Sequence, residues 1–276
     1  KTLARDSRGA ISNSMTARNE DGVLVKTPYK KQEFTELQLQ EFMKCADPDT
    51  GPEYFLRNFF FIQHPVQGKI QYNPWEFQER LIKTYHNYRF SISMMPRQTG
   101  KSTSAAGYLL WFAMFKPDST ILVAAHKYAG AQEIMQRVRY SYESCPDHIR
   151  AGATSYNKGS IEFDNGSRIV AQTTTENTGR GMSITLLYCD EFAFVRPTIA
   201  KEFWTSISPT LSTGGGAIIT STPNSDEDQF AFIWKGANKT EDEYGNTKEL
   251  GVNGFKAYRA YWREHPDRDE PWAEEQ

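Results

Sequence analysis

The 276-residue sequence is poor in cysteine and has no long hydrophobic run. Its three cysteines, Cys45, Cys145 and Cys189, are far apart and form no C-x-x-C pair. This spacing argues against a disulfide framework or a zinc site and indicates reduced thiols, as in cytosolic proteins. The longest apolar run, Tyr108 to Phe115, has eight residues, whereas a membrane-spanning helix needs about 20. We therefore expect no membrane span, and the charged N-terminus predicts no leader peptide.

The sequence also lacks a strong charge of either sign. It has 32 Lys and Arg against 34 Asp and Glu, a net charge of −2. This balance argues against a protein that coats nucleic acid through bulk positive charge, but it permits a local basic track. Hydrophobic residues at 38% and charged residues at 24% are typical of a globular protein.

The hydrophobic pattern changes along the chain. Residues 1–33 have no periodicity, which predicts a flexible arm with little structure of its own. Helices are predicted from Thr35, from Pro52, from Asn73-Pro74 to about Tyr88, and over 102–115, 127–143 and 198–207. Strands are predicted over 90–95, 120–125, 184–189 and 217–221, with a hairpin over 159–172 around Asn165-Gly166. Alternating strands and helices predict an α/β domain with a mostly parallel sheet flanked by helices.

The most distinctive local feature is Met95–Thr103, MPRQTGKST, between a predicted strand and a predicted helix. It is similar to a Walker A loop, G-x-x-x-x-G-K-[ST], with Met95 in place of the first glycine. Gly100 lets the backbone approach a phosphate, Lys101 reaches the β- and γ-phosphates, and the Ser102 hydroxyl can ligate Mg²⁺. The alternative is a chance Gly-Lys-Ser at an ordinary turn, but the flanking elements favour a nucleotide site. The loop residues expected to bind the nucleotide are Gln98, Thr99, Gly100, Lys101, Ser102 and Thr103.

A buried-strand pattern, Leu186–Cys189, is followed by two carboxylates, as in a Walker B strand. Asp190 at the carboxyl end of the strand would hold Mg²⁺, and Glu191 would orient and deprotonate the attacking water. The alternative is an acidic pair in a surface turn. Both motifs occur in order on suitable strands, which favours hydrolysis of ATP or GTP. The adjacent Glu191 indicates the P-loop ATPase class with an additional strand and a catalytic glutamate, and disfavours P-loop kinases.

Two shorter segments also fit a nucleotide site. Small hydroxyl residues after the strand 217–221 can sense a γ-phosphate, although a plain turn closed by Pro-Asn is the alternative. The residues of this segment are Thr220, Ser221, Thr222 and Asn224. In the helix after Asn73-Pro74, Gln78 can bind the adenine edge and Trp75 can stack on the base. The alternative there is an amphipathic helix with an aromatic core face.

Taken together, these segments resemble the large terminase subunits of tailed bacteriophages, most closely the myovirus type, which package DNA into proheads. The likeness covers about residues 73–235. The matching motifs are Arg97-Gln98 ahead of Gly100-Lys101, Asp190-Glu191 ahead of Phe192-Ala193-Phe194, Thr220–Asn224, and Trp75–Gln78.

The resemblance implies roles that spacing alone does not show. Arg97 would be an arginine finger acting in cis, catalytic together with Glu191 and Lys101. Arg180 would sense the nucleotide or contact a neighbouring subunit, with a solvated loop arginine as the alternative. ATP and Mg²⁺ would be the cofactors. The implied partners are double-stranded DNA, a portal protein, a small terminase subunit and other copies in a pentameric ring. The implied location is the host bacterial cytoplasm, with transient docking on the prohead portal.

The resemblance also implies a domain organisation. Residues 34–226 would form the P-loop ATPase core, and residues 227–276 a small lid subdomain and the start of a linker to a nuclease domain absent from this sequence. Nuclease activity is expected only of the full-length protein, because the acidic residues at 264–275 have no strand pattern.

Two other functions remain open. A helicase-like P-loop ATPase that remodels nucleic acid also suits the acidic pair and the Thr/Ser segment, although the Arg97-Gln98 loop favours the terminase. A scaffold that binds ATP without hydrolysing it predicts a defective Walker B strand, whereas Asp190-Glu191 is intact.

Overall fold

The computed structural model describes residues 23–267, and these residues divide into two compact units. The first unit comprises residues 23–73, 105–119 and 133–169, and the second comprises residues 74–104, 120–132 and 170–267. Helices α6 (Lys101–Phe115) and α7 (Tyr128–Ser144) each begin in the second unit and continue in the first. Within the described range, no helix combines the length and the apolar character needed to cross a membrane.

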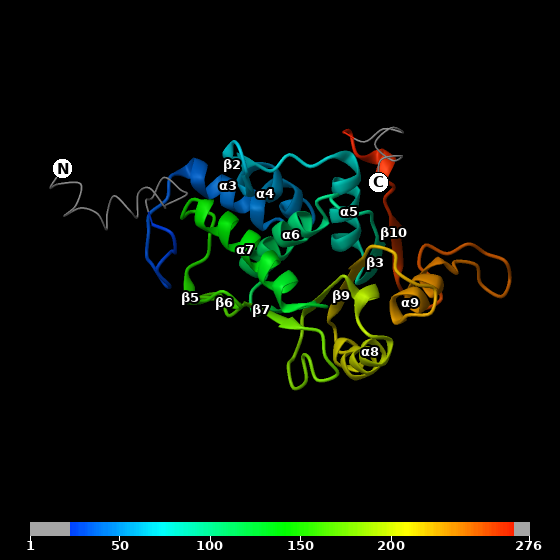
Figure 1. Ribbon diagram of the computed structural model, residues 1–276. Helices are drawn as coiled ribbons and strands as arrows, with labels where there is room; N and C mark the ends of the chain where they lie inside the picture. The colour runs from blue at the N-terminus through cyan, green and yellow to red at the C-terminus, as the bar shows by residue number, and fades with distance from the viewer. Residues whose placement is uncertain (1–22, 268–276) are drawn as a thin grey trace. The chain divides into compact units, whose positions relative to one another are not determined.

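The second unit is built on a parallel sheet (Figure 1). Its strands lie in the order β10 (Lys256–Arg259), β3 (Phe90–Met94), β9 (Gly216–Ser221), β8 (Leu186–Asp190) and β4 (Thr120–Ala125), followed by β7 (Arg168–Thr173). The pairs from β10 to β4 are all parallel. Because β9 lies between β3 and β8, one strand separates the phosphate-loop strand from the acidic strand. This order confirms the predicted additional-strand P-loop class.

One face of this sheet packs against two helices, α8 (Pro197–Leu211) and α9 (Gln229–Asn238), yellow and orange in Figure 1. The buried residues of this core include Ile92, Leu187, Cys189, Ala217 and Ile219 from the strands, and Phe203, Ile207, Leu211, Phe230 and Ile233 from the helices. Phe255, just before β10, belongs to the same cluster. Part of the predicted lid segment is therefore packed into the core of the second unit.

The first unit has helices and strands of its own. They are α3 (Glu36–Ala46), α4 (Gly51–Phe59), the antiparallel pair β1 (Phe61–His64) and β2 (Gly68–Gln71), most of α6 and α7, and the antiparallel pair β5 (Ala153–Tyr156) and β6 (Ser160–Phe163). The predicted hairpin turn at Asn165-Gly166 is confirmed, with Gly166 at a φ of 85°. All three cysteines of the chain are buried and form no disulfide, and burial raises the pKa of Cys145 to about 12.

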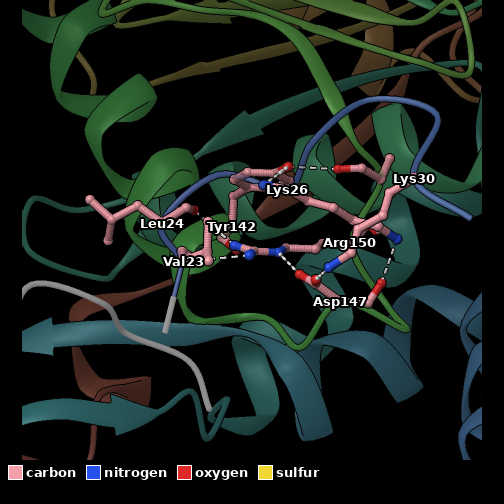
Figure 2. Close-up of polar contacts among 8 residues, drawn as sticks. Val23, Leu24, Lys26, Lys30, Tyr142, Asp147 and Arg150 are labelled. Atoms are coloured by element: carbon pink, nitrogen blue, oxygen red, sulfur yellow. Dashed lines mark hydrogen bonds and ion pairs between the residues drawn. The ribbon is translucent and has the colours of Figure 1, made fainter. Parts of the chain in front are cut away.

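Arg150 fixes the described end of the predicted arm (Figure 2). Its buried guanidinium donates 2.8 Å hydrogen bonds to the carbonyl oxygens of Val23 and Leu24 and to Oδ1 of Asp147. Lys30 contacts the other Asp147 oxygen at 3.0 Å. Residues 23–33 have no helix or strand of their own, as predicted, and Val23, Leu24 and Lys30 are attached to the first unit by these contacts. Residues 1–22 of the predicted arm lie outside the described residues.

Candidate nucleotide-binding site

The carboxyl ends of three neighbouring strands bring the predicted motifs together in the second unit. In the sheet register, Met94 of β3 pairs with Ser221 of β9, and Thr220 of β9 pairs with Asp190 of β8. The N–H of Met95 donates to the Ser221 carbonyl at 3.2 Å. In open α/β sheets, ligands bind at this edge, where the strands end. The phosphate loop, the acidic pair and the Thr/Ser segment therefore start from one edge.

The loop between β3 and α6 passes through two left-handed backbone positions. Met95, which replaces the usual first glycine, is buried, so its side chain packs in the interior. Gln98 and Gly100 have φ values of 57° and 71°, in the left-handed region. A Cβ at Gly100 would lie only 2.5 Å from Nε2 of Gln78. Gly100 therefore permits both the turn and the close approach of α5 (Glu76–Asn87) to the loop.

Glu191 joins all three motifs through its carboxylate. The buried Lys101 ammonium forms an ion pair with Oε1 of Glu191. The other oxygen, Oε2, accepts a 2.9 Å hydrogen bond from the Thr222 hydroxyl. Glu191 itself has a φ of 50°, a left-handed conformation that costs energy for a residue with a side chain. Strain of this kind is typical of functional positions, because the surrounding contacts must hold it.

The residues expected to hold Mg²⁺ fit that ion by their chemistry. Asp190 ends β8 and is almost fully buried, and Oδ1 accepts a 3.4 Å hydrogen bond from the Tyr188 hydroxyl. Ser102, in the first turn of α6, is half-buried. A carboxylate and a hydroxyl supply the hard oxygen atoms that Mg²⁺ prefers, and Mg²⁺ usually takes its remaining ligands from phosphates and water. Among the described residues no group of three or more His, Cys, Asp or Glu side chains could hold a metal.

The Thr/Ser segment is bound to the turn that follows Glu191. Oγ of Ser221 accepts the N–H of Ala193 at 3.2 Å, and the Asn224 side chain donates to the Ala193 carbonyl at 3.0 Å. The Thr220 hydroxyl is buried beside Asp190 and has no hydrogen-bond partner among residues 23–267. Ser221 and Asn224 thus have backbone partners, Thr222 contacts Glu191, and Thr220 retains an unused hydroxyl at this edge. A direct nucleotide contact by each remains a prediction.

Gln78 connects α5 to the phosphate loop. Its Oε1 accepts the N–H of Trp75 at 3.0 Å, and its Nε2 donates to the Thr99 carbonyl at 2.9 Å. The helix accordingly begins at Glu76 with Trp75 as its N-cap residue, not at the predicted Asn73-Pro74. The sequence pattern missed this because Gln78 serves as the capping side chain, which satisfies the free N–H at the helix start. Its adenine contact stays a prediction.

The predicted arginines occupy two different places. Arg97 is exposed on the phosphate loop, next to the exposed Gln98. Arg180 is exposed and lines a cleft of about 560 Å³ with residues of α8, including Lys201 and Glu202. The preceding Gly179 packs closely against α8, because a Cβ there would lie 2.8 Å from Cδ1 of Ile207. Arg180 is therefore exposed directly after a closely packed glycine.

Comparison with known proteins identifies the family. The model of the family described as terminase large subunit, T4-like virus type, N-terminal, matches residues 92–276. The ATPase domain of the Thermus phage P74-26 large terminase is similar in fold, with 21% identity and a TM-score of 0.57 over 74% of this chain and 87% of that one. The HK97 bacteriophage large terminase has 18% identity and a TM-score of 0.60 over 78% of this chain and 44% of that one.

A third structure, the large terminase of the thermophilic bacteriophage D6E in complex with ADP, has 10% identity and a TM-score of 0.55, over 73% of this chain and 49% of that one. The present chain thus matches about half the length of the HK97 and D6E proteins. Likeness at these identities shows the shared fold, and the family model, which covers well over half of the sequence, shows the family. The chain belongs to the terminase large subunits of the T4-like type, and it carries the N-terminal region of that family.

Proposed function

We propose that this packaging ATPase binds ATP and Mg²⁺ at the carboxyl ends of β3, β9 and β8 and uses hydrolysis to move double-stranded DNA. The observation that carries the proposal is the single carboxylate of Glu191, which contacts both Lys101 and Thr222. Nucleotide binding is further supported by the D6E large terminase, which has been solved with ADP and with ATP-gamma-S.

The binding residues follow from the loop geometry. The backbone around Gly100 and the first turn of α6 would hold the phosphates, and Lys101 would reach the β- and γ-phosphates. Ser102 and Asp190 would hold Mg²⁺, which when bound neutralises charge on the phosphate oxygens. Thr99 and Thr103 would support the loop from either side. Arg97, exposed on the same loop, would act as the arginine finger in cis.

Exchange of partners at Lys101 gives the site its cycle. The Lys101 ammonium is neutralised by Glu191. A γ-phosphate offers Lys101 a more highly charged partner, so Lys101 would turn to it and release Glu191 to act as general base. Thr222 would keep the carboxylate oriented through Oε2. When the γ-phosphate leaves, Lys101 would return to Glu191, and the change would reach α9 through Thr222 and Asn224.

The assembly and domain roles are proposed from the family. Double-stranded DNA, a portal protein, a small terminase subunit and neighbouring copies in a pentameric ring would be the partners, in the host cytoplasm and on the prohead. Arg180, which is exposed beside the closely packed Gly179, would contact a neighbouring subunit. Residues 227–276 would act as the lid and lead to a nuclease domain in the longer protein.

ATP-driven packaging of DNA into proheads by the full-length protein tests this function. We expect packaging that stops when ATP is replaced by a non-hydrolysable analogue. ATP-dependent unwinding of duplex DNA without packaging would instead support the helicase-like alternative.

A further inference from the structure

The ring of Trp75, the proposed base platform, is covered by His265. Their ring centroids lie 4.2 Å apart at an interplanar angle of 59°. His265 follows the short helix η2 (Trp262–Glu264), which comes shortly after β10. Phe77 is a second aromatic neighbour of Trp75, with centroids 5.8 Å apart and rings nearly parallel at 27°. Trp75 therefore has aromatic contacts from its own helix and from the segment after β10.

This arrangement leaves no space for a base between Trp75 and His265. Stacked aromatic rings keep their centroids about 4.5–7 Å apart, so each added ring needs a separation of this order. A gap of 4.2 Å holds the two existing rings and nothing else. An adenine that stacks on this part of Trp75 must displace His265.

The segment that carries His265 is attached to α5 and β3 by polar contacts. Glu264 forms an ion pair with Arg80 of α5. The Tyr258 hydroxyl donates a 2.5 Å hydrogen bond to the Phe77 carbonyl. The N–H of Ala260 donates to the Met94 carbonyl, at the end of the phosphate-loop strand, at 3.2 Å. His265 is thus held over Trp75 by a segment that is attached both to α5 and to the end of β3.

The N-terminal end of α5 is connected to the phosphate loop through the hydrogen bond from Gln78 to the Thr99 carbonyl. Trp75 and Gln78 also share the hydrogen bond that starts the helix. The first turn of α5 therefore contacts the phosphate loop on one side and the His265 segment on the other. A base bound on Trp75 would therefore affect both the phosphate loop and the segment that carries His265.

We propose that His265 is a displaceable gate on the adenine platform, for which the base of the nucleotide and the imidazole ring compete. Binding of an adenine nucleotide displaces His265 from Trp75. It also weakens the Glu264–Arg80 ion pair, which attaches residues 261–265 to α5. The phosphates alone do not have this effect, because they bind the loop and not Trp75. The inference rests on the proposed function, in which Trp75 stacks on adenine.

Calorimetric titration with ADP and with inorganic tripolyphosphate tests the gate. His265→Ala removes the competing ring, so we expect it to tighten ADP binding by about 2- to 10-fold, the equivalent of one aromatic pair. Tripolyphosphate affinity should stay the same. Arg263→Ala is the matched control, since this exposed residue of the same segment has its ring contact with Trp262. It should change neither affinity.

Hydrogen exchange of the amides at 261–265 provides the second readout. ADP should speed their exchange, and tripolyphosphate should not. If His265→Ala weakens ADP binding, or if ADP slows exchange in this segment, His265 is a wall of the site and the gate is wrong.

Trp75→Ala separates failure of the gate from failure of the base site. Weaker ADP binding with unchanged tripolyphosphate affinity would support the platform and show that the phosphate loop is still folded. Unchanged ADP affinity in this variant would overturn the platform, and with it the gate. Weaker ADP binding in Trp75→Ala, without tighter binding in His265→Ala, would overturn the gate alone.

Discussion

Lys101 and Glu191, 90 positions apart in the sequence, form an ion pair between the phosphate loop and the acidic strand. Lys101 is the charged residue of the Walker A-like loop, and Glu191 is the second carboxylate of the acidic pair. In this structure the ammonium of Lys101 contacts the carboxylate of Glu191. We propose that this pair holds Glu191 back from acting as a general base until the phosphates of a nucleotide draw Lys101 away. Nucleotide binding and activation of the base would then be the same event.

Gly100→Ala should abolish measurable nucleotide binding. The added Cβ would lie 2.5 Å from Nε2 of Gln78, at a φ of 71° that disfavours any side chain. Gly245→Ala is the control, since Gly245 has a φ of 80° but open space around it. Titration with ADP should show loss of binding only in Gly100→Ala. Equal binding by both variants would contradict the close approach of α5 to the loop.

Thr222→Val should lower kcat by about 10- to 100-fold with little change in KM, because a hydrogen bond to a charged group is worth about 1.5–3 kcal/mol. The lost bond is the 2.9 Å contact from the Thr222 hydroxyl to Oε2 of Glu191. Thr222→Ser keeps the hydroxyl and should restore most of the rate. Steady-state ATPase assays measure kcat and KM of both variants. Equal kcat values for the Val and Ser variants would show that the Thr222 hydroxyl has no role in hydrolysis.

Arg97→Ala should lower kcat by about 10³-fold or more while ATP still binds, as expected for an arginine finger. The side chain is exposed on the loop, so its loss should leave the fold intact. Gln98→Ala, an exposed neighbour, provides a comparison for disturbance of the loop itself. A rise in KM without a fall in kcat would assign Arg97 to ground-state binding instead.

Asp147→Ala should destabilise the protein by about 3–5 kcal/mol, the usual cost of leaving one partner of a buried ion pair alone. Burial would raise the pKa of Asp147, but hydrogen bonds and charge from Lys30 and Arg150 hold the pKa below its ordinary value. The Asp147 carboxylate therefore contributes stability above the ordinary aspartate pKa, and this contribution is lost as the pH falls through the lowered value. Urea unfolding at several pH values measures both effects.

Two comparisons make the Asp147 prediction specific. Glu53→Ala breaks an ion pair with Arg57 in which the Arg57 side chain is 44% exposed and the Glu53 side chain is 50% exposed. It should lower the free energy of unfolding by less than about 1 kcal/mol. Asp147→Ala should also flatten the loss of stability at low pH. An unchanged acid limb would mean that Asp147 is not the group that titrates there.

The sequence predicted the elements whose structure depends on residues close together in the chain. The strand before Met95, the glycine at position 100 and the strand ending at Asp190 each carry their signal within a few residues, and the structure confirms the elements they predict. The pairing of β10 with β3 was missed because KAYR is a four-residue strand whose partner lies far away in the sequence.

Other features had no signal that a sequence could carry. Arg150 binds the backbone carbonyls of Val23 and Leu24, which every residue presents alike. The contact of His265 with Trp75 depends on the path of the chain after β10 and not on any motif. Gln78 matched the pattern of a base-binding residue, and the helix cap it provides became visible only with the backbone in place.

Measurement of ATP binding and ATP hydrolysis by the Glu191→Gln variant tests whether Glu191 is the general base. The amide keeps the shape and the hydrogen bond from Thr222 but cannot accept the proton of the attacking water. We expect ATP affinity to be kept or increased, because Lys101 loses its competing carboxylate, and kcat to fall by about 10²–10⁴-fold. Turnover equal to that of the unmodified protein would contradict Glu191 as the general base and the Lys101–Glu191 pair as the switch.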